Sequence, residues 1–104
     1  MASTSDFAEY VCAQIEGVGA VRYKKMFGEY MVYVNNKPIF LVCDNTVYVK
    51  ILPCLDTLMI DAEKGEPYTG AKEHYILDID NRDLACTVAK TLEPIIPVPK
   101  PKKR

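Results

Sequence analysis

The sequence predicts an α+β domain in which a largely antiparallel five-stranded sheet is packed against N- and C-terminal helices. Apolar residues recur at helical spacing near both ends of the chain. Strand-like runs separated by short turns fill the middle, and one of these runs is nearly all apolar. Because 104 residues with 49% hydrophobic side chains can bury a core, we expect one domain over residues 1–96 and a flexible, basic, proline-rich tail over 97–104.

The first predicted element is a helix over residues 3–19. Its first four residues offer N-caps, and Asp6 with Glu9 has the spacing of a capping box. Its core face is formed by apolar residues at helical spacing: Phe7, Val11, Ile15 and Val18. Gly17 and Gly19 are then expected to end the helix.

Four strand-like runs follow, over residues 20–27, 29–35, 39–44 and 47–52. Gly28 breaks the first run from the second, and Asn35 with Asn36 forms a turn that tolerates left-handed backbone. Short turns between successive strands predict antiparallel neighbours, and hence a meander. The run "IFLVCD" is nearly all apolar, so we expect it to be a central strand.

The second half of the chain is predicted to hold a short helix, a loop, a fifth strand and a final helix, over residues 54–64, 65–73, 74–80 and 83–96. Leu55, Leu58 and Met59 form the apolar face of the short helix. Asn81 or Asp83 caps the final helix, and Pro94 marks its end. The apolar face of that helix is Leu84, Val88 and Leu92.

Charge and hydropathy narrow the class of function. The formal net charge is −1, and four basic residues lie within 100–104, so residues 1–99 carry −5. An acidic body argues against a dedicated DNA-binding domain. The apolar runs are too short to span a bilayer, and the N-terminus shows no secretory signal. We therefore expect a cytoplasmic protein.

Cysteine usage and the single histidine give no support for catalysis. The cysteines Cys12, Cys43, Cys54 and Cys86 form no CxxC pair, and we expect all four to be small buried hydrophobes. His74 has no cysteine or histidine nearby in sequence, and no nucleophile stands in a triad context. The acids Asp78, Asp80 and Asp83 are better explained as a strand end and helix cap than as a cation site. We expect a non-enzymatic protein with no cofactor, no metal and no catalytic residue.

The stretch "RYKKMFGEY" concentrates the basic candidates, which are Arg22, Lys24 and Lys25, with Lys50 further on. Strand alternation places Arg22 and Lys24 on one side and Lys25 on the other. Charge on an edge strand is an ordinary protection against strand-to-strand aggregation. The functional interpretation is an anion or phosphate contact, assisted by Lys50 and by stacking from Tyr23 or Tyr30.

Tyrosines form the second group of candidates. We expect Tyr30, Tyr33, Tyr48 and Tyr75 to line one surface of the sheet. The simpler interpretation is that these tyrosines pair across strands and are half-buried. The functional interpretation is a protein–protein face, which includes a homodimer, because tyrosine combines an apolar ring with a polar tip.

The run "VRYKKMFGEYMVYVNNKPIFLVCDNTVYVKI" resembles the N-terminal domain of the TfoX/Sxy competence-regulator family. The matching residues are Lys25, Met26, Phe27, Gly28, Tyr30, Tyr33, Lys37, Phe40, Leu41, Val42, Tyr48, Val49 and Lys50. The segment "PYTGAKEHYILD" is similar to the family's aromatic segment and the strand that follows it. Glu29 and Met31 depart from the pattern, since they replace two glycines of the family.

The resemblance implies the fold directly. It implies a role in competence or transcriptional regulation only indirectly, because full-length regulators of this family continue into a second, helical domain. We expect a stand-alone single-domain member that acts as a regulatory or adaptor domain through protein contacts, with transcription machinery as the partner. Its candidate interaction surface is Arg22, Lys24, Lys25, Tyr30, Tyr33, Tyr48 and Lys50.

Two alternatives stay open. The first is a weak nucleic-acid-binding module that uses the basic strand and the tail, and a contiguous basic patch would favour it. The second is a small-ligand binder or enzyme with a pocket between sheet and helices. A deep pocket lined by His74 and acids would favour the second alternative.

Overall fold

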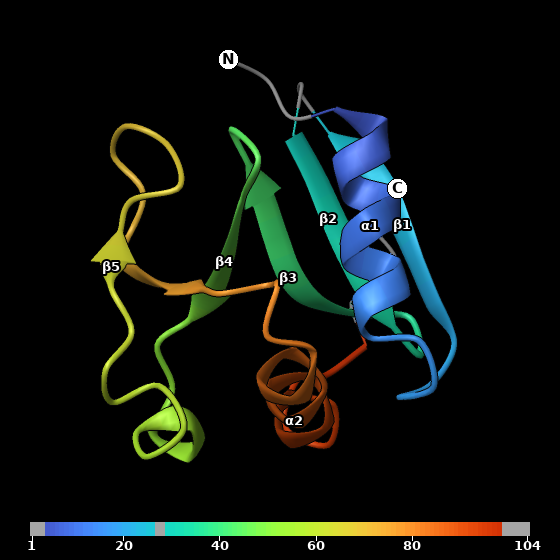
Figure 1. Cartoon of the computed structure of the whole chain (residues 1–104). Coiled ribbons are helices and arrows are strands. Elements are labelled where there is room, and N and C mark those ends of the chain that lie inside the picture. The colour runs from blue at the N-terminus through green and yellow to red at the C-terminus, as the bar shows by residue number, and fades with distance from the viewer. Residues whose placement is uncertain (1–3, 27–28, 99–104) are drawn as a thin grey trace, which may run out of the picture.

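The computed structural model describes residues 4–26 and 29–98 and confirms the α+β class (Figure 1). The elements are α1 (Ser5–Gln14), β1 (Val21–Met26), β2 (Glu29–Val34), β3 (Lys37–Cys43), β4 (Thr46–Lys50), the short 3₁₀ helix η1 (Pro53–Leu55), β5 (Lys64–Gly65), β6 (His74–Leu77) and α2 (Arg82–Leu92). The predicted turn at Gly28 and most of the predicted tail lie outside the described residues, so both stay predictions.

The described strands form one antiparallel sheet in the order β1-β2-β3-β4-β6-β5. The meander of the first four strands and the central position of β3 are confirmed. The predicted number of five strands is wrong, because the sheet has six strands among the described residues. The extra strand, β5, pairs Lys64 with Tyr75 and Gly65 with His74. Two residues are too few to show an alternating pattern in a sequence.

Paired left-handed residues close the two hairpins that follow β2 and β3. The φ angles are 53° and 67° at Asn35 and Asn36, and 51° and 53° at Asp44 and Asn45. Two consecutive residues with positive φ match the right-handed twist of the flanking strands, and asparagine and aspartate adopt this conformation at low cost. The two turns therefore set the registers of β2 with β3 and of β3 with β4.

Both main helices are capped by side chains. The Thr4 hydroxyl accepts a hydrogen bond from the Phe7 amide at 3.2 Å, so Thr4 is the N-cap of α1 and the predicted Asp6–Glu9 capping box is wrong. Asn81 caps α2 as predicted, since its side chain accepts from the Leu84 amide at 3.1 Å. The predicted apolar residues are buried or half-buried. The predicted end of the first helix at Gly17 and Gly19 is wrong, because α1 ends at Gln14 and Val18 lies beyond it.

The predicted helix over 54–64 is wrong. The chain forms only η1 there, continues through turns and then enters β5. Cysteine, aspartate, threonine and isoleucine are weak helix formers, and five of these eleven positions carry them. Buried Leu55 and Met59 fix the segment to the core without a periodic helix. The expectation that all four cysteines are buried is wrong, because Cys54 on this segment is exposed, Cys12 and Cys86 are half-buried, and Cys43 is buried.

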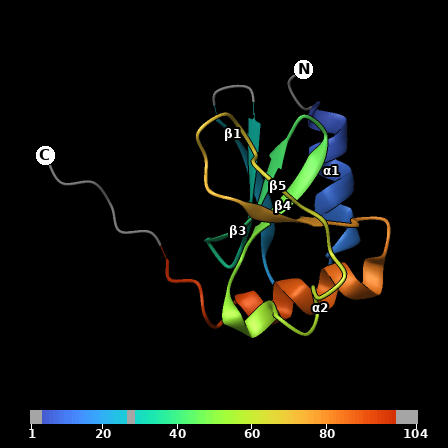
Figure 2. The same cartoon turned by 90° about the vertical axis from the view of Figure 1, so that its left-hand side faces the viewer.

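The helices and the sheet form two layers. α1 runs beside β1 and β2, and α2 crosses beneath the ends of the strands (Figures 1 and 2). The hydrogen bond from Gln14 Nε2 to the Ile79 carbonyl, 2.8 Å long, ties α1 to the segment that leads into α2. The loop over 66–73 lies on the other side of the sheet (Figure 2). No helix among the described residues is long and apolar enough to cross a membrane.

Candidate functional site: the open face of the sheet

Strand register divides the sheet residues between two faces. The face against the helices, here called the covered face, includes Val32, Phe40, Val42 and Val49, all with no exposed surface. The opposite face is here called the open face and includes Arg22, Lys24, Met31, Tyr33, Leu41, Tyr48, Lys50, His74 and Ile76. Successive pairings align Lys24, Met31, Leu41, Tyr48 and Ile76 in one row across five strands. Side chains in such a row contact their neighbours across the strands.

Five of the seven candidate residues share the open face. They are Arg22, Lys24, Tyr33, Tyr48 and Lys50. The predicted separation of Arg22 and Lys24 from Lys25 is confirmed, because Lys25 pairs with Tyr30 on the other side of the sheet. Lys25 is exposed there, near the end of β1.

The prediction that four tyrosines line one surface is wrong. Tyr30 and Tyr75 lie on the covered face, each with only 5% of its surface exposed. The ring of Tyr23 contacts that of Tyr30 edge-on at a centroid distance of 5.5 Å, and the Tyr23 hydroxyl reaches Glu9 at 3.3 Å. Tyr30 is therefore a core residue beside α1, and it does not belong to the candidate surface. Strand alternation alone separates Tyr30 from Tyr33, which is an odd number of positions away.

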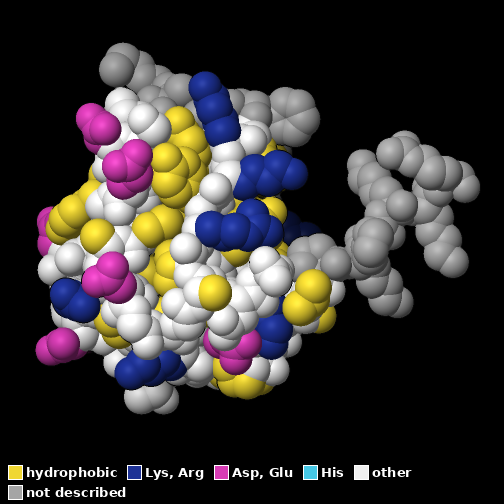
Figure 3. All heavy atoms as spheres, turned by 90° about the vertical axis from the view of Figure 1, so that its right-hand side faces the viewer, with side chains coloured by type: hydrophobic (Ala, Val, Ile, Leu, Met, Phe, Trp, Pro, Cys, Tyr) yellow, Lys and Arg dark blue, Asp and Glu magenta, His cyan; other side chains and the backbone are white. Residues whose placement is uncertain are grey.

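Arg22 is held above a tyrosine on the open face. Its guanidinium carbon lies 4.2 Å from the centroid of the Tyr33 ring, and its Nε donates to Asn36 Oδ1 at 3.4 Å. A guanidinium stacked on an aromatic ring keeps donors free for a further partner. Figure 3 shows Lys and Arg side chains in a row over β1, with Asp and Glu side chains over the neighbouring α1.

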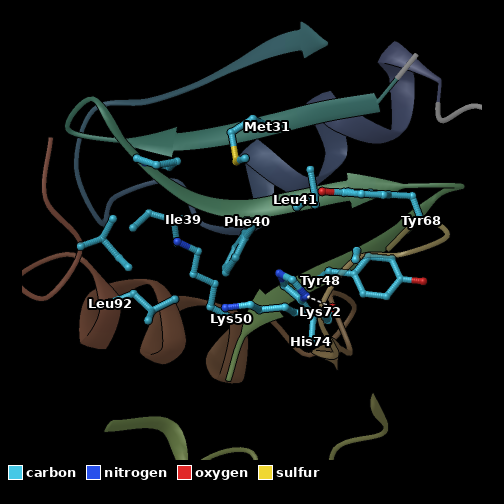
Figure 4. Close-up of a pocket in the computed structure, with 13 residues that line it drawn as sticks. Met31, Ile39, Phe40, Leu41, Tyr48, Lys50, Tyr68, Lys72, His74 and Leu92 are labelled. Carbon is cyan, nitrogen blue, oxygen red and sulfur yellow. Dashed lines mark hydrogen bonds between the residues drawn. The ribbon is translucent and has the colours of Figure 1, made fainter. Parts of the chain in front are cut away.

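A cavity of about 330 Å³ opens on this face between β3, β4, the loop over 66–73 and the end of α2 (Figure 4). Its apolar wall includes Ile39, Phe40, Leu41, Leu92 and Ile96. Its polar side chains are those of Lys50, Lys72, His74 and the two tyrosines Tyr48 and Tyr68. A β-bulge shapes the wall: Val32 pairs with Phe40 and Tyr33 with Pro38, so Ile39 is the additional residue of β3.

His74 has a defined hydrogen-bonding state in this cavity. Its Nδ1 lies 2.8 Å from the carbonyl oxygen of Lys72, which can only accept, so Nδ1 carries the hydrogen. The ring also meets Tyr48 edge-on at 6.5 Å. Nε2 is thus the ring nitrogen left to interact with a ligand. The cavity has His74 as the second alternative requires, but lysines take the place of the acids among its described lining residues.

A second hollow continues along the open face and shares Met31, Leu41 and Tyr68 with the first. It also contains Cys43, whose pKa is raised to about 12 by burial and by the neighbouring Glu29 carboxylate. A thiol that stays protonated at neutral pH is a poor nucleophile. Within residues 4–26 and 29–98, no group of His, Cys, Asp and Glu side chains is arranged to hold a metal ion.

Sequence reasoning missed Tyr68, Lys72 and Ile96 as part of this site. Tyr68 and Lys72 lie in a loop, which neither strand nor helix periodicity includes. Ile96 continues the four-residue spacing of the final helix, but it comes after α2 has ended at Leu92. The one available signal is "PYTGAKEHYILD", which already resembles a segment of the TfoX N-terminal domain. That segment supplies the covering loop and the polar wall of the cavity.

Comparison with known proteins identifies the family of this chain. The chain is 30% identical to the "Uncharacterized 12.7 kDa protein in trpE 5'region" of Spirochaeta aurantia, over 99% of this chain and 91% of that protein. The family model of the TfoX N-terminal domain matches residues 13–81, which include the whole sheet from β1 to β6. This match extends over more than half of the 104 residues. The chain therefore belongs to the TfoX N-terminal domain family.

Proposed function

We propose that this domain is a non-catalytic regulatory adaptor that binds a partner protein through the open face of its sheet. One observation carries the proposal: the helices cover one face only, and the other presents a partly exposed apolar row with cations at its borders. The members of the row are Met31, Leu41, Tyr48 and Ile76. Apolar surface rimmed by polar groups is typical of protein–protein contact sites.

The chemistry of the open face supports protein contact. Tyrosine, methionine and arginine are the residues enriched at interfaces, and Tyr33, Tyr48, Met31 and Arg22 supply them here. The contact with Tyr33 already orients Arg22, which lowers the entropic cost of binding. Membership of the TfoX N-terminal domain family leads us to propose a component of the transcription machinery as the partner.

Site-specific photo-crosslinking in the native cell tests the proposal. A benzophenone amino acid is placed at Tyr33 or Tyr48 on the open face, and at Tyr10 on α1 as the matched control, because Tyr10 is also a partly exposed tyrosine. We expect the same protein to be captured from positions 33 and 48 but not from position 10, and mass spectrometry identifies it. No capture from the open face, or equal capture from all three positions, would contradict the proposal.

Nucleic-acid binding is the second candidate, and one observation favours it. The cations Arg22, Lys24 and Lys50 lie on the same face as Tyr33 and Tyr48, and cations beside aromatic rings are the elements of single-strand recognition. The charge of −5 on residues 1–99 opposes it.

Fluorescence anisotropy with labelled duplex DNA and single-stranded RNA at low salt tests whether the domain binds nucleic acid. Arg22→Glu with Lys24→Glu is compared with Lys25→Glu, which reverses a charge on the opposite side of the same strand. A nucleic-acid-binding domain would show salt-dependent binding that the double variant abolishes and Lys25→Glu largely keeps. The adaptor that we propose shows no specific binding in either assay.

A further inference from the structure

The structure assigns a second, separate role to the open face: we infer that the cavity beside Lys50, Lys72 and His74 binds a small organic anion whose carboxylate is attached to an apolar, ring-sized body. This inference goes beyond the proposed partner contact and does not depend on it. It follows from the charges around the cavity, from the rigidity of its apolar wall and from its size.

The charges come first. Lys50 and His74 are paired across β4 and β6, and Lys72 is two positions before His74, so two ammonium groups and an imidazole line one part of the cavity. Among the described residues, no carboxylate lies within ion-pairing distance of Lys50 or Lys72, and no acidic side chain is part of the wall. Positive charge collected in a hollow of an otherwise acidic body attracts anions to that hollow.

The apolar wall is part of the protein core. Phe40 and Leu92 have at most 1% of their surface exposed, and Ile39 and Ile96 at most 7%. Packing within the core holds these side chains in place behind the cavity, which favours a pre-formed site with little reordering on binding. The opposite side is the Tyr68 ring, which is 62% exposed and can close over a flat ligand.

Size and geometry limit the class of ligand. A volume of about 330 Å³ is at the small end of ligand-binding pockets. Figure 4 shows Lys50, Lys72 and His74 around one part of the cavity, and aliphatic side chains line the rest. A molecule that satisfies both parts has one anionic end and one apolar end. The ligand's carboxylate accepts hydrogen bonds from the Lys50 and Lys72 ammonium groups, and its ring packs between Leu41 and Tyr68, which both have accessible surface.

Nuclear magnetic resonance titration of the full chain with a matched pair of probes tests the inference. The probes are 3-phenylpropionate and its neutral amide, 3-phenylpropionamide, which has nearly the same shape. We expect amide shifts from 3-phenylpropionate at residues 39–41, 48–50 and 68–74. Because a hydrogen bond to a charged group contributes more than a neutral one, we expect the carboxylate to bind about tenfold more tightly than the amide.

Lysine variants show whether the preference for the carboxylate probe comes from the charges around the cavity or from the shape of the cavity. In Lys50→Gln with Lys72→Gln, we expect the preference for the carboxylate to disappear while the amide binds as before, which also shows that the cavity is still folded. Lys25→Gln removes the same charge from the other side of the sheet and should leave both affinities unchanged. Equal affinity for the two probes in the unaltered protein, or shifts spread over the whole surface, would overturn the inference. Crosslinking from Tyr33 addresses the partner, so either proposal can fail alone.

Discussion

The covered face and the open face of this sheet are built from the same strands, yet they differ in what their side chains do. In β2, Val32 is fully buried against the helices, and Met31 beside it is only partly covered. In β3, Phe40 and Leu41 show the same contrast. Alternation along a strand thus assigns stability to one face and leaves the other available for recognition. A substitution on the covered face should therefore lower stability, and a substitution at the neighbouring position on the open face should weaken binding.

The largest expected effect comes from placing a charge on each face of β2. Val32→Asp puts a carboxylate among fully buried apolar side chains, which costs several kcal/mol and is enough to unfold a domain of ordinary stability. Met31→Asp places the same charge one position away, on the open face, and we expect less than about 1 kcal/mol of destabilisation. Urea unfolding followed by circular dichroism measures both.

Met31→Asp, the less destabilising of the two substitutions, should have the larger direct effect on partner binding. Met31→Asp should abolish the crosslink from Tyr33 although the protein stays folded, because the charge interrupts the apolar row. A folded Val32→Asp variant with native stability would mean that the covered face does not carry the stability of the domain.

A smaller effect is expected at the glycines that lead into β1. Gly17 and Gly19 have φ angles of 100° and 155°, and alanine at either one costs about 1–3 kcal/mol in backbone strain. At Gly19, a Cβ would also lie 2.8 Å from Asn35 Nδ2. The Asn35 side chain cannot move away freely, because its Oδ1 accepts from the Ala20 amide at 2.9 Å.

Gly19→Ala should therefore destabilise the domain more than Gly17→Ala, which meets nothing within 4 Å. The added cost of overpacking is about 1–3 kcal/mol. The two midpoints of urea unfolding give the difference directly. Equal losses in the two variants would show that Asn35 yields at no cost.

The sequence predicts the parts of this molecule that repeat locally and misses the parts that depend on distant contacts. The helix faces, the hairpin at Asn35 and Asn36 and the central position of β3 follow from spacing and turn chemistry. The sequence does not predict β5, because the two residues of this strand are recognisable only by their pairing with β6. It does not predict the bulge at Ile39 either, because no local sequence feature marks the additional residue. For the candidate site, alternation correctly groups Arg22 with Lys24 but cannot place Tyr68, which a loop brings to the cavity.

The open face makes a modest contribution to stability through the contact between Arg22 and Tyr33. Partly exposed cation–π pairs contribute about 0.5–1 kcal/mol. A double-mutant cycle with Arg22→Gln and Tyr33→Leu should give a coupling free energy of this size. Lys24→Gln with Tyr33→Leu is the control, because Lys24 pairs with Met31 instead of Tyr33. A coupling of zero in the first cycle would mean that Tyr33 does not hold Arg22 in place.

The smallest expected effect lies outside both faces, where the β2–β3 hairpin meets the end of α2. Hydrogen bonds from Lys37 and Asn35 to the Glu93 carboxylate, with the Lys37 charge, lower the pKa of Glu93 below its ordinary 4.5. A carboxyl group whose pKa is lower in the folded state stabilises fully above its unfolded pKa and loses that contribution as the pH falls through the folded value. Glu93→Gln should thus lower the melting temperature at neutral pH, and the difference should vanish well below pH 4.5.

Two further variants show whether this acid dependence comes from the contact with Lys37. Lys37 Nζ also donates to the backbone carbonyl of Glu93 at 2.7 Å, a bond that protonation of the carboxylate leaves in place. Lys37→Met removes both interactions, so its loss of melting temperature should persist in part at low pH, where that of Glu93→Gln has gone. Glu66→Gln, which follows β5 at the far edge of the sheet, removes a carboxylate without touching Lys37 and should leave the acid dependence unchanged. If Glu93→Gln and Glu66→Gln respond alike to acid, net charge would explain the effect and the Lys37 contact would not.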